Sequence, residues 1–356
     1  GTGINLLRAM TNETATISGS ISVPENGTLT IGAVSGSNTT GSGGRLEIFG
    51  GISGAGNVNY GTLSAVTSYG GTVALLGTVN GFGINTYSGT STFNSSRVEI
   101  GGDTLYSGPA NAPVIVSGPF GTGSMTWTSG EGGNGAEFLA VGGPRTIVNA
   151  FNATSSAANA TWKFMGNQAL TFTRDWNISS DATLRNRVLQ VNNLYQPTTF
   201  LGNLSNTGAQ GANFLKTGSG LLVLGGTNTQ ANLFTTDGNY GTGVFIDSGI
   251  LRVNGNAALG STAALAAAGP HLAGPADVRL RGGYLSVSSG FITDRQFILT
   301  NSSGGIDVAA GETLTLTKQT AGAFNLRKVG PGTLALNSNA NTISALTLGG
   351  AQHLNS

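Results

Sequence analysis

The chain has 356 residues, of which 59 are glycine and none is cysteine. The missing cysteines exclude a disulfide framework, thiolate zinc sites and cysteine catalysis. Charged residues make up only 9% of the sequence and balance to a net charge of +1, so nucleic-acid binding has no electrostatic basis. Hydrophobic residues still amount to 38%, and no apolar run reaches the ~18 residues of a membrane helix. We therefore predict a folded core and no membrane span.

Short strands are predicted along the whole chain, and helices almost nowhere. Gly, Thr, Ser and Asn interrupt nearly every window, and each disfavours a helix interior. Alternation of apolar and polar residues, which indicates a half-buried strand, occurs in residues 27–31, 45–49, 72–76 and 313–317. Most of these segments are bounded by Gly, Asn or Ser, which are typical of turns. The pattern predicts an all-β protein.

Two kinds of element repeat within the chain. Residues 214–224 and 326–336 share one pattern, in which an apolar residue and a lysine precede a Gly-x-Gly turn and a strand. A looser copy of this pattern lies at residues 70–77. Residues 248–253 and 282–287 share a second pattern, a glycine followed by an alternating strand. Repeated turn-strand units that cannot bury a face alone are typical of stacked coils.

We therefore predict an elongated, right-handed parallel β-solenoid (β-helix) that forms one domain over residues 1–356, with a weaker repeat register in 131–211. Coils of roughly 20–25 residues are expected. Stacking of coils places equivalent inward residues on one another, which predicts a core of aliphatic ladders. The residues expected to point inward are Leu222, Leu224, Leu251, Val253, Leu285, Val287, Leu314, Leu316, Leu334 and Leu336.

The first pattern resembles the autotransporter-associated β-strand repeat, whose motif runs roughly leucine, x, lysine, x, glycine, x, glycine, threonine, leucine, x, leucine. Residues 214–224 and 326–336 match this motif closely, with phenylalanine in place of the opening leucine in the first copy. Residues 85–90 match the Asn-Thr-Tyr-x-Gly turn that follows it in the family. The resemblance is good over residues 212–340 and weaker over 20–130.

The stretch from Asn254 to Leu336 also looks like a complete inter-repeat unit of this family and contains Arg295. The resemblance implies a right-handed parallel β-solenoid on the bacterial cell surface or outside the cell. It implies no enzymatic activity, because the repeat is a scaffold.

The acidic residues are spread along the chain, whereas glycan-cleaving solenoids need converging carboxylates. The densest ionic group consists of Arg174, Asp175, Asp181, Arg185 and Arg187. Adjacent strand residues point to opposite faces, so we favour a solvated surface role for this group. Contact with a carbohydrate beside Trp176 is the alternative. We predict no catalytic residues and a protein that is not an enzyme.

No metal or cofactor site is predicted. The two histidines, His271 and His353, lie in no ligand spacing, so we interpret them as surface residues. Asp307 lies in a glycine-rich segment like those of calcium coils, but one carboxylate cannot supply the six or more oxygens that calcium prefers. Asp103 and Asp237 are likewise single, which leaves calcium binding through backbone carbonyls as the alternative.

Glycine pairs and large aromatic residues are interpreted as structural. The Gly-x-Gly pairs at 218–220 and 330–332 precede strands, so they lack the helix N-terminus of a phosphate loop and instead predict turns with positive φ. The aromatic residues are expected to fill the core, with sugar-stacking platforms as the alternative. They are Trp127, Trp162, Trp176, Tyr87, Tyr195 and Tyr284.

The function predicted from the sequence is structural: an extracellular or cell-surface solenoid that serves as a fibre, layer or stalk. Its expected partner is itself, because a solenoid has two open ends and neither terminus resembles a polar cap. End-to-end stacking into a homo-oligomer or filament fits, as does an excerpt whose neighbouring segments continue the coil. Two alternatives are an autotransporter adhesin that binds surface glycans or a host surface, and a polysaccharide-cleaving β-helix enzyme.

Overall fold

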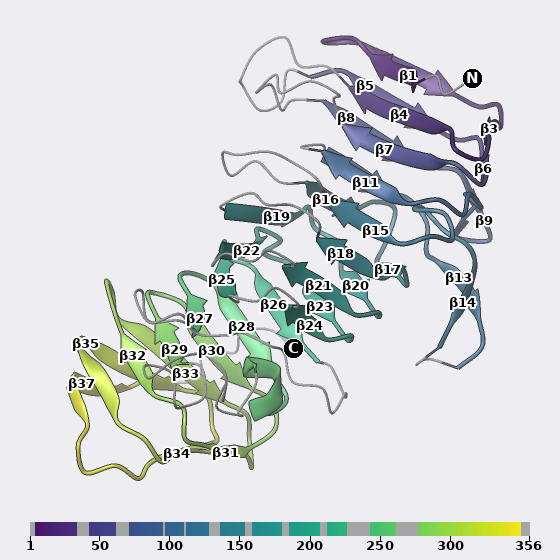
Figure 1. The fold of residues 1–356 in the computed structure, drawn as a ribbon. Coiled ribbons are helices and arrows are strands. Elements are labelled where there is room, and N and C mark those ends of the chain that lie inside the picture. The colour runs from purple at the N-terminus through teal and green to yellow at the C-terminus, as the bar shows by residue number, and fades with distance from the viewer. Residues whose placement is uncertain are drawn as a thin grey trace. The chain divides into compact units, whose positions relative to one another are not determined.

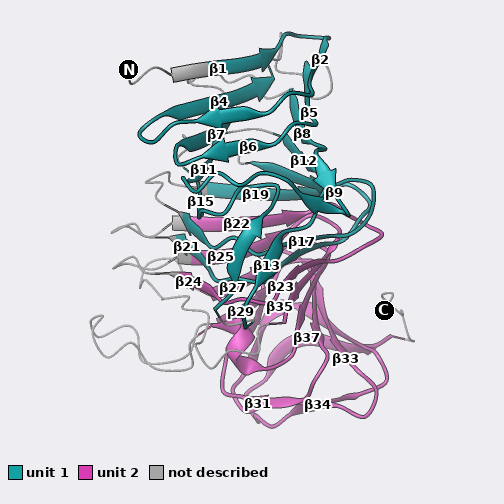
Figure 2. Cartoon of the chain, turned by 90° about the vertical axis from the view of Figure 1, so that its right-hand side faces the viewer, with its two compact units in different colours: residues 1–178 teal, residues 179–356 magenta. Residues whose placement is uncertain are grey.

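The computed structural model describes residues 4–33, 43–61, 71–94, 97–109, 112–127, 136–153, 159–179, 185–206, 212–225, 243–260 and 277–349. The chain divides into two compact units, Gly1–Ile178 and Ser179–Ser356, coloured teal and magenta in Figure 2. Within each unit, short strands from successive coils lie side by side in parallel ladders (Figure 1). The predicted all-β fold, a parallel β-solenoid, is confirmed.

Unit 1 carries two long parallel ladders. The first contains β1 (Ile4–Ala9), β4 (Thr28–Ala33), β7 (Asn57–Gly61), β11 (Ser91–Asn94), β15 (Met125–Trp127), β18 (Phe151–Ala153) and β21 (Trp176–Ser179). The second contains β2 (Thr14–Ile17), β5 (Arg45–Ile48), β8 (Thr72–Leu75), β12 (Arg97–Ile100), β16 (Glu137–Ala140) and β19 (Asn159–Met165). Each coil therefore contributes one strand to each ladder.

A third position in the coils of unit 1 is more variable. Two coils place β3 (Ile21–Val23) beside β6 (Ile52–Gly54), and two later coils place β17 (Arg145–Ile147) beside β20 (Leu170–Phe172). Between these pairs, two antiparallel hairpins are inserted into successive coils: β9 (Thr78–Val79) with β10 (Phe82–Gly83), and β13 (Leu105–Ser107) with β14 (Val114–Ser117).

Unit 2 repeats this architecture. One ladder contains β22 (Arg185–Val191), β25 (Ala212–Thr217), β27 (Gly243–Ile246), β29 (Asp277–Leu280), β32 (Phe297–Leu299), β35 (Thr320–Val329) and β37 (Thr342–Leu348). The next contains β23 (Thr198–Phe200), β26 (Leu221–Leu224), β28 (Ile250–Val253), β30 (Tyr284–Val287), β33 (Gly304–Val308) and the end of β35. The remaining elements are β24 (Leu204–Asn206), η1 (Asn256–Leu259), β31 (Phe291–Thr293), β34 (Thr313–Leu316) and β36 (Thr333–Leu336).

Inward residues of neighbouring coils stack as predicted. Leu251 pairs with Leu222 on one side and with Leu285 on the other, and all three are fully buried. Of the ten predicted core residues, eight are buried. Leu334 and Leu336 are only half-buried, because among the described strands β36 pairs on one side alone, with β34.

The coils are less uniform in length than predicted. Val278 pairs with Phe297, 19 residues further along the chain, whereas Ser91 pairs with Met125, 34 residues further, across the hairpin β13–β14. The upper limit of about 25 residues per coil is wrong, because whole hairpins are inserted at coil corners without disturbing the ladders. Loop closure costs only ~0.6 kcal/mol for each doubling of loop length, so such insertions are tolerated.

The coils that follow the hairpins are the most aromatic part of unit 1. In the first ladder Phe151 pairs with Trp176, and its ring stacks on the Trp176 ring with a centroid separation of 4.4 Å. Trp127 and Trp162 are equally buried, and their rings lie 5.4 Å apart. Aromatic rings therefore take core positions here that leucine and valine take in unit 2, and the ladders continue through this segment.

Candidate functional site

The Gly-x-Gly turns of the repeat are each held by a buried lysine. Gly218 and Gly330 both have φ of 75°, the positive value that the sequence predicts. Lys216 lies two residues before Gly218 and is fully buried, and its ammonium donates to the carbonyl oxygens of Thr217 at 2.8 Å and Gly218 at 2.7 Å. The lysine therefore gives hydrogen bonds to turn carbonyl groups that would otherwise be buried without a partner.

Lys216 also joins one coil to the next. Its third hydrogen bond, of 3.1 Å, goes to the carbonyl oxygen of Ser248, which lies in the following turn. An ammonium group has three donors and no acceptor, so three carbonyls satisfy it completely. Burial lowers the pKa of Lys216 to about 7, and the nearby Asp247 carboxylate opposes this shift.

The second copy of the motif repeats the arrangement. Lys328 donates to the carbonyl oxygens of Val329 at 2.6 Å and Gly330 at 2.8 Å. Asp307 lies beside this turn: it accepts a 2.9 Å hydrogen bond from the Ser286 hydroxyl, and a Cβ atom at position 330 would collide with its carboxylate. Burial lowers the pKa of Lys328, again against the field of Asp307.

A buried arginine performs the same task at the short helix η1. Arg295 is completely buried, and its guanidinium donates to Asn256 Oδ1 at 2.8 Å and to the Gly260 carbonyl at 2.6 Å. Burial lowers its pKa to about 10. Sequence reasoning noted Arg295 only as part of the resemblance. Like the lysines, it is buried and donates a hydrogen bond to a backbone carbonyl.

The pKa of Lys216 predicts how stability depends on pH. In the unfolded chain this lysine titrates near 10.5, so between about pH 7 and 10 the unfolded state binds more protons than the folded state. The free energy of unfolding should therefore rise with pH, by at most about 1.4 kcal/mol per pH unit from this group.

Urea unfolding at several pH values between about 7.5 and 9.5 measures this slope. In this range tyrosine in the unfolded chain stays largely protonated. The upper limit matters because burial raises the pKa values of Tyr60 and Tyr87. The Lys216→Met variant is the control, and it should show a smaller slope than the wild-type protein. Equal slopes in the two proteins would contradict the assignment to Lys216.

The large aromatic residues serve mainly as core, as predicted. All three tryptophans and Tyr87 are buried. Tyr87 shares a buried hydroxyl network with Tyr60 and Ser91, in which the two phenol oxygens lie 2.9 Å apart. Tyr284 is half-buried, and Tyr195 is the exception, with 77% of its surface exposed. The six residues therefore form no common sugar-stacking stripe.

The residues of the ionic group around Arg174 do not share one environment: two lie at or near the surface and one lies in the core. Asp175 is exposed and Arg174 half-buried, which agrees with a surface role. Arg187 contradicts that interpretation, because only 1% of it is exposed. Along β22 it lies on the same face as the buried Leu189 and Val191, so it points into the core. Asp181 and the side chain of Arg185 lie outside the described residues.

The isolated acids and the histidines add no site. Asp103 accepts a 2.6 Å hydrogen bond from the Thr146 amide and so supports the backbone between two coils. Asp237, His271 and His353 fall outside the described residues. Over the described ranges, no three His, Asp or Glu side chains gather closely enough to hold a metal ion. No helix within those ranges is long and apolar enough to cross a membrane.

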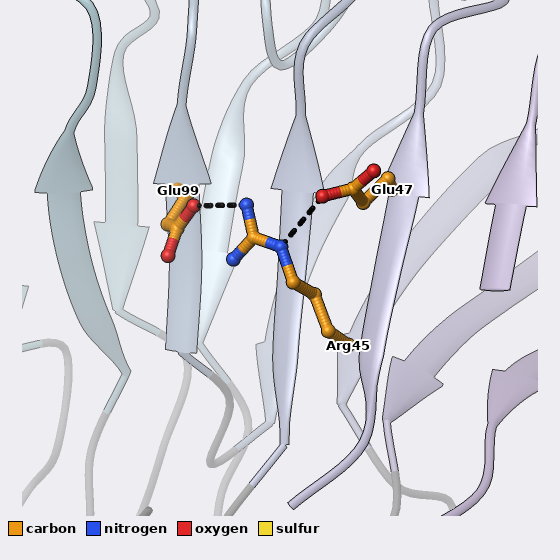
Figure 3. A network of polar contacts seen from close by, with 3 residues as sticks. All are labelled: Arg45, Glu47 and Glu99. Carbon is orange, nitrogen blue, oxygen red and sulfur yellow. Dashed lines mark hydrogen bonds and ion pairs between the residues drawn. The ribbon is translucent and has the colours of Figure 1, made fainter. Parts of the chain in front are cut away.

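The outer face of the second ladder in unit 1 carries a network of charges. Arg45 on β5 donates from Nε to Glu47 and from Nη2 to Glu99 on β12, both at 2.7 Å (Figure 3). It reaches over β8 because the residue between the two glutamates is Ala74. Farther along, Glu137 accepts from Arg97 at 2.9 Å and pairs with Lys163 at 3.3 Å.

This network should contribute little to stability. Its side chains are 15–33% exposed, and pairs near the surface are typically worth less than about 1 kcal/mol. We expect Arg45→Met to lower the free energy of unfolding by that amount or less, with a smaller effect at high salt. A double-mutant cycle with Glu99→Gln measures the pair, and a coupling above about 2 kcal/mol would contradict this expectation.

Exposed apolar residues concentrate on the hairpin β13–β14. Tyr106, Val114 and Val116 are 44%, 64% and 49% exposed, and Leu105 is 37% exposed. Large apolar side chains gathered on one exposed element are typical of contact surfaces. In the sequence, this apolar hairpin is indicated only by a long segment without charged residues, between Asp103 and Glu131.

Comparison of the chain with protein-family models, curated proteins and solved structures gives no significant match. The resemblance to the autotransporter-associated repeat therefore rests on the quoted motifs and stays a prediction.

Proposed function

We propose that this chain is a structural protein of the bacterial cell surface or the extracellular space, in which the solenoid serves as a fibre, layer or stalk. The observation that carries the proposal is the use of the repeat's own lysine. Lys216 and Lys328 are the reactive groups of the repeated motif, and both are hydrogen-bonded to turn carbonyls. The charged groups of the motif hold its turns, and in the first copy the lysine also joins one coil to the next, which supports the role of a building unit.

Self-association is the second part of the proposal. Among the described strands, β1 pairs only with β4 and β37 only with β35. Leu6 on β1 is 46% exposed, and Leu348 on β37 is 77% exposed. An open strand edge that carries apolar side chains recruits another strand. Either adjoining segments of a longer chain cover these edges, or separate copies stack end to end into a filament.

Light scattering over a dilution series, together with electron microscopy, tests self-association. Stacking predicts particles that lengthen in multiples of one subunit as concentration rises. The variant Leu348→Lys should shift this equilibrium to the monomer, because it places a charge at the open edge. Val79→Lys, the same kind of change at a 60% exposed apolar residue of the hairpin β9–β10, is the control and should assemble normally. A monomer at every concentration would refute self-association.

An adhesin is the second candidate, and the hairpin β13–β14 favours it. This element presents Tyr106 and Val114 to solvent, whereas the ladder strands that pair on both sides bury most residues of this kind. Binding to glycan arrays and host matrix proteins, measured for the wild type and for Tyr106→Ser combined with Val114→Thr, tests this function. Binding that is lost in the double variant supports a contact through the hairpin, and unchanged binding contradicts it. The polysaccharide-cleaving enzyme is not favoured, because the converging carboxylates of Glu47 and Glu99 are both paired with Arg45.

A further inference from the structure

Asn254 is followed by glycine at the point where β28 ends and η1 begins. An Asn-Gly pair is chemically labile, because the glycine nitrogen can attack the asparagine side chain when no Cβ hinders the approach. The sequence holds four such pairs, at Asn26, Asn80, Asn134 and Asn254. Asn134 lies outside the described residues, which leaves three environments to compare.

Two of the three pairs are fixed in tight turns. Asn26 has a positive φ of 62°, and the amide of Gly27 donates a 2.9 Å hydrogen bond to the carbonyl of Pro24. Asn80 and Gly81 have φ of 53° and 85° and form the two-residue turn of the hairpin β9–β10. Primed hairpin turns of this kind require left-handed backbone at both positions, so the peptide between them cannot rotate unless the hairpin opens.

The pair at Asn254 is open. Asn254 is exposed, and its side-chain amide makes a long hydrogen bond of 3.3 Å to the carbonyl of Gly225. No described residue accepts a hydrogen bond from the Gly255 amide. Gly255 is fully extended, with φ of 174°, and apart from its chain neighbours no atom of the described residues lies within 4 Å of the place where a Cβ would stand. The peptide between the two residues is therefore free to turn until its nitrogen reaches the side-chain carbonyl.

We propose that Asn254 is a site of spontaneous deamidation in the folded protein. The Gly255 nitrogen bonds to Asn254 Cγ and gives up its proton, and the side-chain amide nitrogen leaves as ammonia, so a five-membered imide forms. Water then opens the imide at either carbonyl and yields aspartate or isoaspartate. No oxidation or reduction is involved, and water is the only co-reactant.

The modification has two local consequences. A carboxylate replaces the amide that donates to Gly225 of the preceding coil, so one link between successive coils is lost. The net charge of the chain falls from +1 to zero at neutral pH, which isoelectric focusing detects without any assay of function. Isoaspartate also lengthens the backbone just before Asn256, the residue that anchors Arg295.

Peptide mapping by mass spectrometry tests the proposal on the folded protein during incubation in mildly alkaline buffer. We expect Asn254 to lose its amide roughly tenfold faster than Asn26 and Asn80, because the other two must first break turn hydrogen bonds. In urea the three rates should converge. Equal rates in the folded protein, or faster loss at Asn80, would overturn the proposal.

Gly255→Ala is the matched control variant. Any residue adopts the extended backbone of Gly255, and a Cβ there meets no atom of the described residues beyond its chain neighbours, so the variant should fold with unchanged stability. The new methyl group hinders attack, and deamidation at Asn254 should slow roughly tenfold while the rates at Asn26 and Asn80 stay the same. An unchanged rate at Asn254 would show that Gly255 is not the nucleophile.

Discussion

Replacing Lys216 by methionine should lower the free energy of unfolding by about 1–3 kcal/mol. Methionine matches the length of the lysine chain but donates no hydrogen bond, so the carbonyls of Thr217, Gly218 and Ser248 lose their shared partner. Removing a buried charge recovers some desolvation energy, and this gain limits the loss. Urea unfolding followed by circular dichroism measures the difference.

Lys163→Met is the matched control for this prediction. Lys163 lies on the outer face of β19, where its ammonium pairs with Glu137 at 3.3 Å and its side chain is 20% exposed. The same substitution there should cost less than about 1 kcal/mol. A Lys216→Met protein that is as stable as the wild type would show that the turn does not need the ammonium, and would weaken the structural interpretation of the motif.

The ladders were predictable from the sequence because the residues that become buried are the apolar ones that recur at every second position. Thr313 to Leu316 alternate, and in the structure Leu314 and Leu316 are buried while Thr313 is exposed. Pairing each strand with its partner needs only an equivalent position in the next coil. Coil length does not follow from this rule, because a hairpin such as β13–β14 leaves the ladder register unchanged.

The buried cations were harder to predict, although the sequence carries a signal for them. Lys216 stands two residues after the buried Phe214, on the same side of β25. Arg187 similarly precedes the buried Leu189 by two. Period-2 reasoning places both inside, yet a charged residue is normally assigned to the surface. For Lys216, what reverses that assignment is a set of turn carbonyls, and their direction is known only once the turn is folded.

The contacts between coils in the charge network of unit 1 could not be predicted. Arg45 and Glu99 are 54 residues apart and meet because two coils of different length bring their strands into register. Nothing in the local sequence around either residue encodes that distance. Such contacts follow from the fold and are therefore weak evidence for function.

Leu251→Ala should destabilise the protein by about 2–5 kcal/mol, the largest effect that we expect from a single substitution. Leu251 is fully buried between Leu222 and Leu285, so truncation opens a cavity that neighbours on both sides help to line. Backbone ladder bonds hold these strands at their spacing, and the coils cannot close on the gap.

Leu336→Ala provides the comparison, because this leucine is half-buried and pairs with Leu316 alone among described residues. We expect a loss of about 1 kcal/mol or less there, since solvent already reaches the side chain. Denaturant unfolding of both variants gives the two losses in free energy. The comparison requires that the free energy depends on denaturant concentration with the same slope in both variants. If the two losses are equal, stacking on both sides is not the source of stability. A loss confined to Leu251 would show that each coil is stabilised by its neighbours, as a solenoid requires.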